Sequence, residues 1–178
     1  MDPSLAYVDT FDGRLLDAFH PPGPLHQLSI RHLDIAPDGT ICLAAQYEGA
    51  ANNHPPLVAI HHNEDALQWL DAPDGVCRKM RNYCGSLCDD RGDELVVVSA
   101  PRGNRVVFWS LRQTRYMAQT EVTDGCGLAA GTVAGEFVIN SGRGDVLRYR
   151  VSEQQRATAL RADAADARWD NHMLRLSV

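Results

Sequence analysis

Short runs of alternating apolar and polar residues follow one another along the chain, separated by turns rich in Gly, Asp and Pro. The stretch HLDIAPDGTICLAAQYEG (32–49) combines a short segment, a Gly-containing turn, a β-rich segment and a second Gly. This pattern predicts two antiparallel strands joined by a tight turn. Helical periodicity is hard to find. Its best candidate, DGVCRKMRNY (74–83), is short and is expected to form a loop with one helical turn.

The hairpin pattern occurs two more times, as CGSLCDDRGDELVVVSAPRG (84–103) and CGLAAGTVAGEFVINSGRG (126–144). Counted from the first residue of each copy, the turn glycine comes 7, 8 and 9 positions later (Gly39, Gly92, Gly135), and the closing glycine comes 17, 19 and 18 positions later (Gly49, Gly103, Gly144). Two further strand-like runs follow each copy, so the predicted unit is a four-stranded meander. Starts at 32, 84, 126 and about 171 give periods of roughly 52, 42 and 45 residues, which are typical of β-propeller blades.

The repeat predicts an all-β fold, a partial β-propeller with about three complete four-stranded blades plus flanking strands. In a single domain, the expected blades cover approximately 32–73, 84–122 and 126–164, outer strands lie within 4–20, and a last inner strand lies at 169–176. Such an arc has exposed blade edges and apolar faces, so we expect self-association through those edges or recruitment of a protein partner. A non-propeller all-β sandwich is the alternative arrangement.

Charge and composition narrow the range of partners. The 178 residues carry a formal net charge of -6, which excludes a broad nucleic-acid surface because such surfaces need a basic excess. The chain contains no run of eighteen apolar residues, so no membrane span is expected. The N-terminus lacks the basic and apolar regions of a signal peptide, and as written the chain would be cytoplasmic. The five cysteines include no C-x2-C pair and indicate buried free thiols.

Two strings, HQLSIRHL (26–33) and WDNH (169–172), are the most specific pieces of a wider pattern that includes LAYVDTFDGRLL, PPLVAIHH, SAPRGNRVVFW, CGLA and SGRG. Together they resemble the C-terminal half of the DUF1513 family. The resemblance implies a seven-bladed, YVTN-like propeller that is exported to the periplasm by the twin-arginine route and often encoded near iron-uptake components. It implies no particular reaction. The chain departs from the family pattern at Tyr83-Cys84-Gly85, so Cys84 is not expected to share a function.

The candidate binding face is the end of the blades where the inner strands start and where the second strand turns into the third. Arg102 and Arg143 occupy equivalent loops of successive blades, and we expect them to hold a small anionic ligand, a carboxylate or phosphate, by forked hydrogen bonds. Alternatively, each Arg-Gly pair marks a loop whose glycine needs a positive φ. The predicted ligand-binding residues are Arg102, Arg143, Tyr47, Gln46, Asn171 and His172.

His32, His172 and Cys126 carry the ligand types that suit a soft or borderline transition metal, so they form the predicted metal set. The alternative is that these histidines are hydrogen-bonded structural residues. HHNED (61–65) also resembles a metal motif, but its place between the third and fourth strands of a blade predicts a solvated turn. In WDNH, Trp169 and Asp170 are expected to be structural.

The sequence therefore predicts a non-enzymatic propeller that binds a small anionic ligand or a protein partner on its funnel face, in a metal-acquisition setting. One alternative is a propeller enzyme, either a metal-dependent oxidoreductase or a lactonase-like hydrolase. No catalytic residue is predicted, because no serine lies in a G-x-S-x-G elbow and acid–base chemistry would need Asp34, Asp124 or Asp170 beside a histidine. A structural protein-interaction platform is the other alternative.

Overall fold

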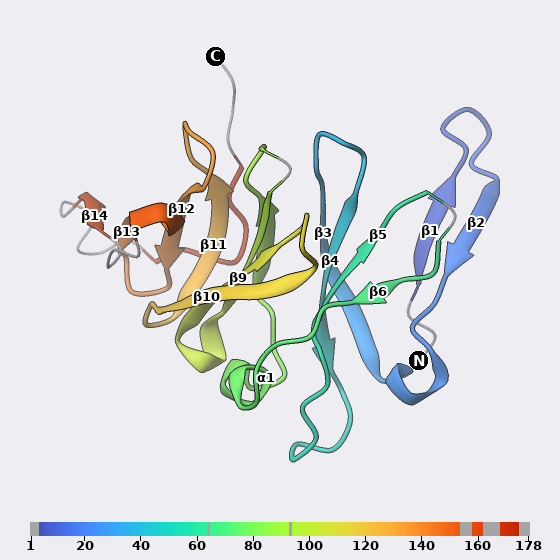
Figure 1. Ribbon diagram of the computed structural model, residues 1–178, viewed down its shortest axis with the longest axis horizontal. Coiled ribbons are helices and arrows are strands. Elements are labelled where there is room, and N and C mark those ends of the chain that lie inside the picture. The colour runs from blue at the N-terminus through green and yellow to red at the C-terminus, as the bar shows by residue number, and fades with distance from the viewer. Residues whose placement is uncertain (1–3, 64, 93, 154–157, 162–167, 175–178) are drawn as a thin grey trace.

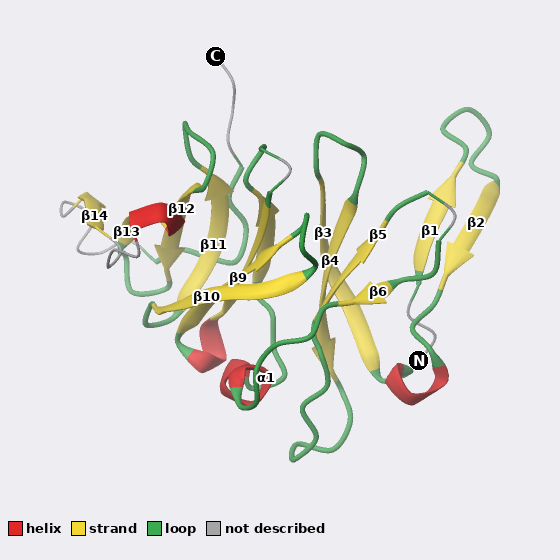
Figure 2. Cartoon of the chain, viewed as in Figure 1, coloured by secondary structure: helices red, strands yellow, loops and turns green. Residues whose placement is uncertain are grey.

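The computed structural model describes residues 4–63, 65–92, 94–153, 158–161 and 168–174. Over these residues the chain forms four antiparallel sheets, one with two strands and three with four strands (Figure 1). Helices are few and short, as Figure 2 shows. They are α1 (Val76–Met80) and the 3-10 helices η1 (Gly23–Leu25), η2 (Pro101–Gly103) and η3 (Val151–Glu153). The predicted all-β class is confirmed, and the arrangement is consistent with a partial propeller.

Each four-stranded sheet is a meander, because its strands lie in space in the order in which they follow along the chain. The N-terminal hairpin contains β1 (Leu5–Val8) and β2 (Leu15–Phe19). Sheet 1 contains β3 (Leu28–Ile35), β4 (Ile41–Tyr47), β5 (Val58–His61) and β6 (Gln68–Trp69). Sheet 2 contains β7 (Ser86–Asp89), β8 (Leu95–Ala100), β9 (Arg105–Ser110) and β10 (Arg115–Glu121). Sheet 3 contains β11 (Gly125–Ala130), β12 (Glu136–Ser141), β13 (Val146–Arg150) and β14 (Thr158–Arg161).

The first strands of the three larger sheets meet in one region, which we call the hub. β3 contacts β7, and β7 contacts β11, so the three sheets fan out from this line (Figure 1). A turn with a left-handed glycine joins the first two strands in sheet 1 at Gly39 (φ 88°) and in sheet 3 at Gly135 (φ 71°). A glycine suits these positions because a side chain rarely adopts a positive φ.

Apolar side chains between neighbouring sheets form the core. Trp109 and Met80 belong to the cluster between sheets 1 and 2. The ring of Phe108 fills the space between sheets 2 and 3, with its centroid 5.6 Å from that of Phe137 and 4.8 Å from that of Tyr149. Sheet 2 is covered on both faces, which explains why every residue of its β8 strand, LVVVSA, is buried.

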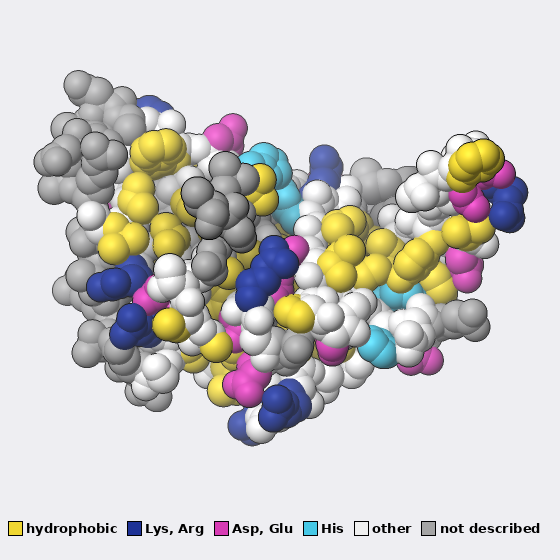
Figure 3. Space-filling view, turned by 90° about the horizontal axis from the view of Figure 1, so that it is seen from above, with side chains coloured by type: hydrophobic (Ala, Val, Ile, Leu, Met, Phe, Trp, Pro, Cys, Tyr) yellow, Lys and Arg dark blue, Asp and Glu magenta, His cyan; other side chains and the backbone are white. Residues whose placement is uncertain are grey.

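The N-terminal hairpin packs on the outer face of sheet 1. Tyr7 and Phe19 lie against His61 of β5, with ring centroids 5.7 and 4.2 Å away, and His61 is only 1% exposed. The prediction of a solvated turn at HHNED is therefore wrong for its first histidine, because the hairpin covers it. The hairpin leaves the β3 strand uncovered on this face, and Leu33 and Ile35 remain 56% and 51% exposed. Apolar side chains gather over this part of the molecule in Figure 3.

The C-terminal segment crosses the hub from sheet 3 to sheet 1. Residues 169–174 are the described part of the expected last inner strand, and they pair with no described strand. Instead, Trp169 Nε1 donates to the carbonyl oxygen of Gly144 at 3.2 Å, and Asn171 Nδ2 donates to the hydroxyl oxygen of Tyr83 at 3.4 Å. The helical turn expected within 74–83 is confirmed as α1. No helix among the described residues has the length and apolar character that a membrane crossing requires.

Candidate functional site

Two pockets lie at opposite ends of the hub. The Arg102 pocket has a volume of about 390 Å³ and lies where β7 and β11 begin. Its polar lining comes from Tyr83, Arg102, Asp124, Cys126, Asp170 and Asn171. The His32 pocket has a volume of about 350 Å³ and lies near the ends of β3 and β7. Its polar lining comes from Arg31, His32, Asp34, Ser86, Arg91 and His172. The C-terminal segment contributes to both pockets as it crosses the hub.

Arg102 is oriented by an aromatic ring. It sits in η2, between β8 and β9, and its guanidinium carbon lies 4.2 Å from the ring centroid of Tyr83, which precedes β7. This cation–π contact holds the side chain without using its N–H donors. Asn171, from the C-terminal segment, donates to the same tyrosine hydroxyl. Three segments far apart in sequence thus bring a cation, a phenol and an amide to one pocket, and two of the three were predicted ligand residues.

The other groups in the Arg102 pocket are acidic or weakly polar. Asp124 and Asp170 place two carboxylates on its lining. Cys126 donates from Sγ to the backbone oxygen of Asp124 at 3.1 Å. The pKa of its thiol is raised, mainly by burial and secondly by the negative charge of Asp124. Cys126 is therefore a neutral hydrogen-bond donor in this pocket. The lining suits a ligand that carries an anionic group and hydroxyl or amine donors together.

Three predicted ligand residues lie outside both pocket linings. Arg143 is exposed in the turn between β12 and β13, where its backbone N–H donates to Ser141 Oγ at 3.2 Å. The positive-φ explanation fits its neighbour Gly144, at 99°, whereas Gly103 beside Arg102 has no positive φ. Gln46 Nε2 donates to the backbone oxygen of Cys84 at 3.2 Å and ties sheet 1 to sheet 2.

Tyr47, the third of these residues, is the last residue of β4, and its hydroxyl binds two neighbouring side chains. Its hydroxyl donates to Gln27 Oε1 at 3.3 Å and accepts from Asn53 Nδ2 at 2.9 Å. The bond from Asn53 holds the long connection between β4 and β5 against the end of β4. The sequence placed Tyr47 and Gln46 correctly at the end of the sheet where β7 begins, but their hydrogen-bonding groups bind the protein itself.

Two of the three predicted metal residues come together in the His32 pocket. The rings of His32 and His172 lie 5.4 Å apart between centroids, although 140 positions separate them in sequence. His32 lies in the middle of β3, not at its start as expected. Burial lowers its pKa first, and His172 lowers it further, which favours the neutral imidazole. Cys126 lines the other pocket, and no group of three His, Cys, Asp or Glu residues within the described ranges is arranged to hold a metal ion.

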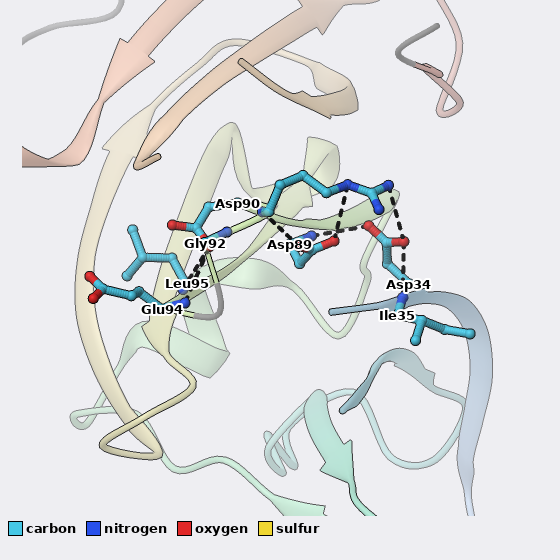
Figure 4. A network of polar contacts seen from close by, with 8 residues as sticks. Asp34, Ile35, Asp89, Asp90, Gly92, Glu94 and Leu95 are labelled. Carbon is cyan, nitrogen blue, oxygen red and sulfur yellow. Dashed lines mark hydrogen bonds and ion pairs between the residues drawn. The ribbon is translucent and has the colours of Figure 1, made fainter. Parts of the chain in front are cut away.

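A carboxylate network that no sequence motif predicted lies beside the His32 pocket (Figure 4). The backbone N–H of Asp89 donates to Asp34 Oδ2 at 3.1 Å, and Arg91 approaches both carboxylates, with Nε 3.6 Å from Asp89 Oδ2 and an Nη atom 3.9 Å from Asp34 Oδ1. Burial, together with the neighbouring Asp34, raises the pKa of Asp89 to about 6. In the sequence, CDDRG (88–92) resembled an ordinary turn, and only the fold shows that β3 faces it.

The model of the family described as "Protein of unknown function (DUF1513)" matches residues 1–176. A search among curated proteins found no match to the chain. The family match covers the three sheets, the N-terminal hairpin and both pocket linings.

Proposed function

The chain belongs to the DUF1513 family, and from the geometry of its Arg102 pocket we propose that it is a non-enzymatic binding protein for a small anionic ligand. The observation that carries the proposal is the Arg102 guanidinium, which lies over the Tyr83 ring, makes no hydrogen bond to another described residue and shares its pocket with the Asn171 amide. A periplasmic setting and a link to metal acquisition, implied by the family resemblance, belong to the same proposal.

The pocket favours one class of anion over others. A carboxylate can accept two parallel N–H bonds from a guanidinium, which is the strongest arrangement that Arg102 can offer. Asp124 and Asp170 repel a compact, highly charged anion, but their oxygens accept hydrogen bonds from hydroxyl groups. We therefore propose a hydroxycarboxylate, whose carboxylate binds Arg102 and whose hydroxyl groups donate to the aspartates. Gluconate, with one carboxylate and several hydroxyl groups, is a suitable probe of this class, and its ferric complex tests the link to metal acquisition.

Isothermal titration calorimetry with gluconate, ferric gluconate and inorganic phosphate tests the proposal. Arg102→Ala should weaken gluconate binding about tenfold or more, the loss expected for one charge-assisted hydrogen-bonded pair. Arg143→Ala is the matched control, because this exposed arginine occupies the equivalent loop of sheet 3 and lies outside the pocket. It should bind gluconate within twofold of the wild type. Equal binding by the two variants, or no gluconate binding by the wild type at millimolar concentration, would contradict the proposal.

The exposed apolar face of sheet 1 supports a second candidate, an interaction platform. Leu33 and Ile35 of β3, with Val8 and Leu15 of the hairpin, are each at least half exposed, and surface patches of this kind commonly mark association sites. Light scattering of the chain should show concentration-dependent association, and Leu33→Ser with Ile35→Ser should reduce it. A monomer at all concentrations would remove this candidate.

A further inference from the structure

The corner where β7 turns into β8 joins all three large sheets. Asp89, the last residue of β7, meets Asp34 of β3 and so connects sheet 2 to sheet 1. The next residue, Asp90, accepts from the backbone N–H groups of Gly92 and Leu95 within its own turn, and its second oxygen accepts from Gly135 of sheet 3 at 3.3 Å. Figure 4 shows the two aspartates pointing to different neighbours. The pair therefore connects sheet 2 to both of its neighbours near the hub.

The two aspartates differ in how well their oxygens are satisfied. Both oxygens of Asp90 accept backbone hydrogen bonds. The side chain of Asp89 is fully buried, its Oδ1 accepts from the N–H of Arg91 at 2.7 Å, and its Oδ2 accepts no hydrogen bond from any described residue. The guanidinium of Arg91 stays 3.6 Å from that oxygen, and its side chain is 58% exposed. A buried carboxylate oxygen with no donor is costly, and adding a proton removes the cost.

We propose that Asp89 is a proton-operated latch between sheets 1 and 2, closed when its Oδ2 carries a proton and donates to the Asp34 carboxylate. In the closed state the unsatisfied oxygen becomes a donor, and the like-charge repulsion between the two carboxylates disappears. In the open state, the Asp89 N–H bond and the long contacts of Arg91 are what remains of the polar contacts between Asp34 and this corner. The pKa of Asp89, raised to about 6, places the transition between mildly acidic and neutral conditions.

The surroundings of Asp89 determine the direction of the response. Asp34 from β3 and the exposed Arg91 are the charged groups that act on it. The neighbouring thiols, Cys42 of β4 and Cys88 of β7, stay protonated because burial raises their pKa above the ordinary range. Since the pKa of Asp89 is higher in the folded chain than in the unfolded chain, its stabilising effect is present at low pH and is lost as the pH rises through about 6.

The latch lies next to the His32 pocket and is coupled to it. Asp34 and Arg91 line that pocket, and His32 lies two residues before Asp34 on β3. When the latch opens, the pocket gains one negative charge at its margin, and the β3 strand loses one of its ties to sheet 2. Proton uptake at Asp89 is thus expected to tighten β3 against β7 and to make the His32 pocket more rigid.

Two measurements on the full chain test the latch. In the first, the side-chain carboxyl carbon of Asp89 is followed by NMR between pH 4 and pH 8. It should titrate near 6 in the wild type, and lower in Asp34→Asn, because the neighbouring carboxylate is then absent. Asp12→Asn, in the exposed tip of the N-terminal hairpin, is the control and should leave this titration unchanged.

The second measurement is hydrogen–deuterium exchange of β3 and β7 at pH 5 and pH 7.5, expressed as protection factors. In the wild type, protection should fall at the higher pH by up to about tenfold, since a carboxyl group with a pKa of about 6 in the folded chain and about 3.9 in the unfolded chain loses that factor of stability between pH 5 and pH 7.5. Asp89→Asn carries a permanent donor and should keep the same protection at both pH values. Titration of Asp89 near 4, or an unchanged pH dependence of protection in Asp89→Asn, would overturn the proposal.

Discussion

A methyl group added at Gly103 should test how closely α1 packs against η2, the 3-10 helix that carries Arg102. A Cβ atom on Gly103 would lie 3.1 Å from the carbonyl carbon of Lys79 and from Cα of Met80, and closer still to the Lys79 oxygen. All three atoms belong to the backbone of α1, so no side-chain rotation relieves the contact. For Gly103→Ala, η2 or α1 must move, and overpacking of this kind destabilises a fold by about 1–3 kcal/mol.

Gly23→Ala is the matched control. Like Gly103, Gly23 belongs to a 3-10 helix that contains a proline, but a Cβ atom on Gly23 would meet nothing within 4 Å. Alanine at such an open position is expected to be neutral or stabilising by up to about 1 kcal/mol. Urea unfolding, followed by tryptophan fluorescence, measures both variants. Gly103→Ala should also weaken gluconate binding, since Arg102 is its neighbour. A stability of Gly103→Ala within about 0.5 kcal/mol of Gly23→Ala would refute the reasoning, because the two sites would then be equivalent.

The remaining predictions concern titration and reactivity. His32 should titrate below its usual value, so protonation of His32 should cost stability as the pH falls below about 6.5, and His172→Ala should move its pKa part of the way back. NMR of the imidazole protons measures both effects, and a His32 that titrates above 6.5 would contradict the geometry. Among the five thiols, Cys77 is the partly exposed one, so mild alkylation of the folded protein should modify it well before Cys42 and Cys84. Mass spectrometry of the labelled peptides gives the order, and early modification of Cys84 would show that the core between sheets 1 and 2 is open.

The sheets were predictable because their signal is local. Alternation with a period of two, interrupted by glycine turns such as that at Gly39, recurs three times and determines which strands pair. The helical turn before β7 was also visible, because DGVCRKMRNY is the best candidate for helical periodicity in the sequence. Burial between sheets explains the continuous apolar character of β8. Each of these features depends on residues that are close together in sequence.

The features that the sequence did not show depend on contacts between distant segments. The polar residues that follow His61 in the sequence predicted a solvated turn, but the rings of Tyr7 and Phe19 cover its imidazole. Asp89 resembled a turn residue, and only the approach of Asp34 makes it a buried carboxylate pair. No periodicity encodes these contacts, because they arise when separate sheets pack against one another.

The candidate site was predictable in part for the same reason. Equivalent places in repeated units located Arg102 and Cys126 at one end of the hub, where both line the same pocket. Arg143, in the equivalent loop of sheet 3, was predicted at the same end of the hub, but its side chain lies outside the lining of the Arg102 pocket. Repeat position determines the end of the sheet on which a residue lies. The direction of its side chain depends on neighbours such as the Tyr83 ring, which repeat position does not specify.

The central claim is that sheets fanning from one hub bring the C-terminal segment back across β3. The nuclear Overhauser effect between the ring protons of His32 and His172 measures this directly, because the two rings lie 5.4 Å apart between centroids. We predict a clear cross-peak between the two imidazoles, and its loss in His172→Ala identifies it. Absence of the cross-peak in a folded wild-type protein would show that the segment does not cross the hub, and the Asn171 contribution to the Arg102 pocket would be lost with it.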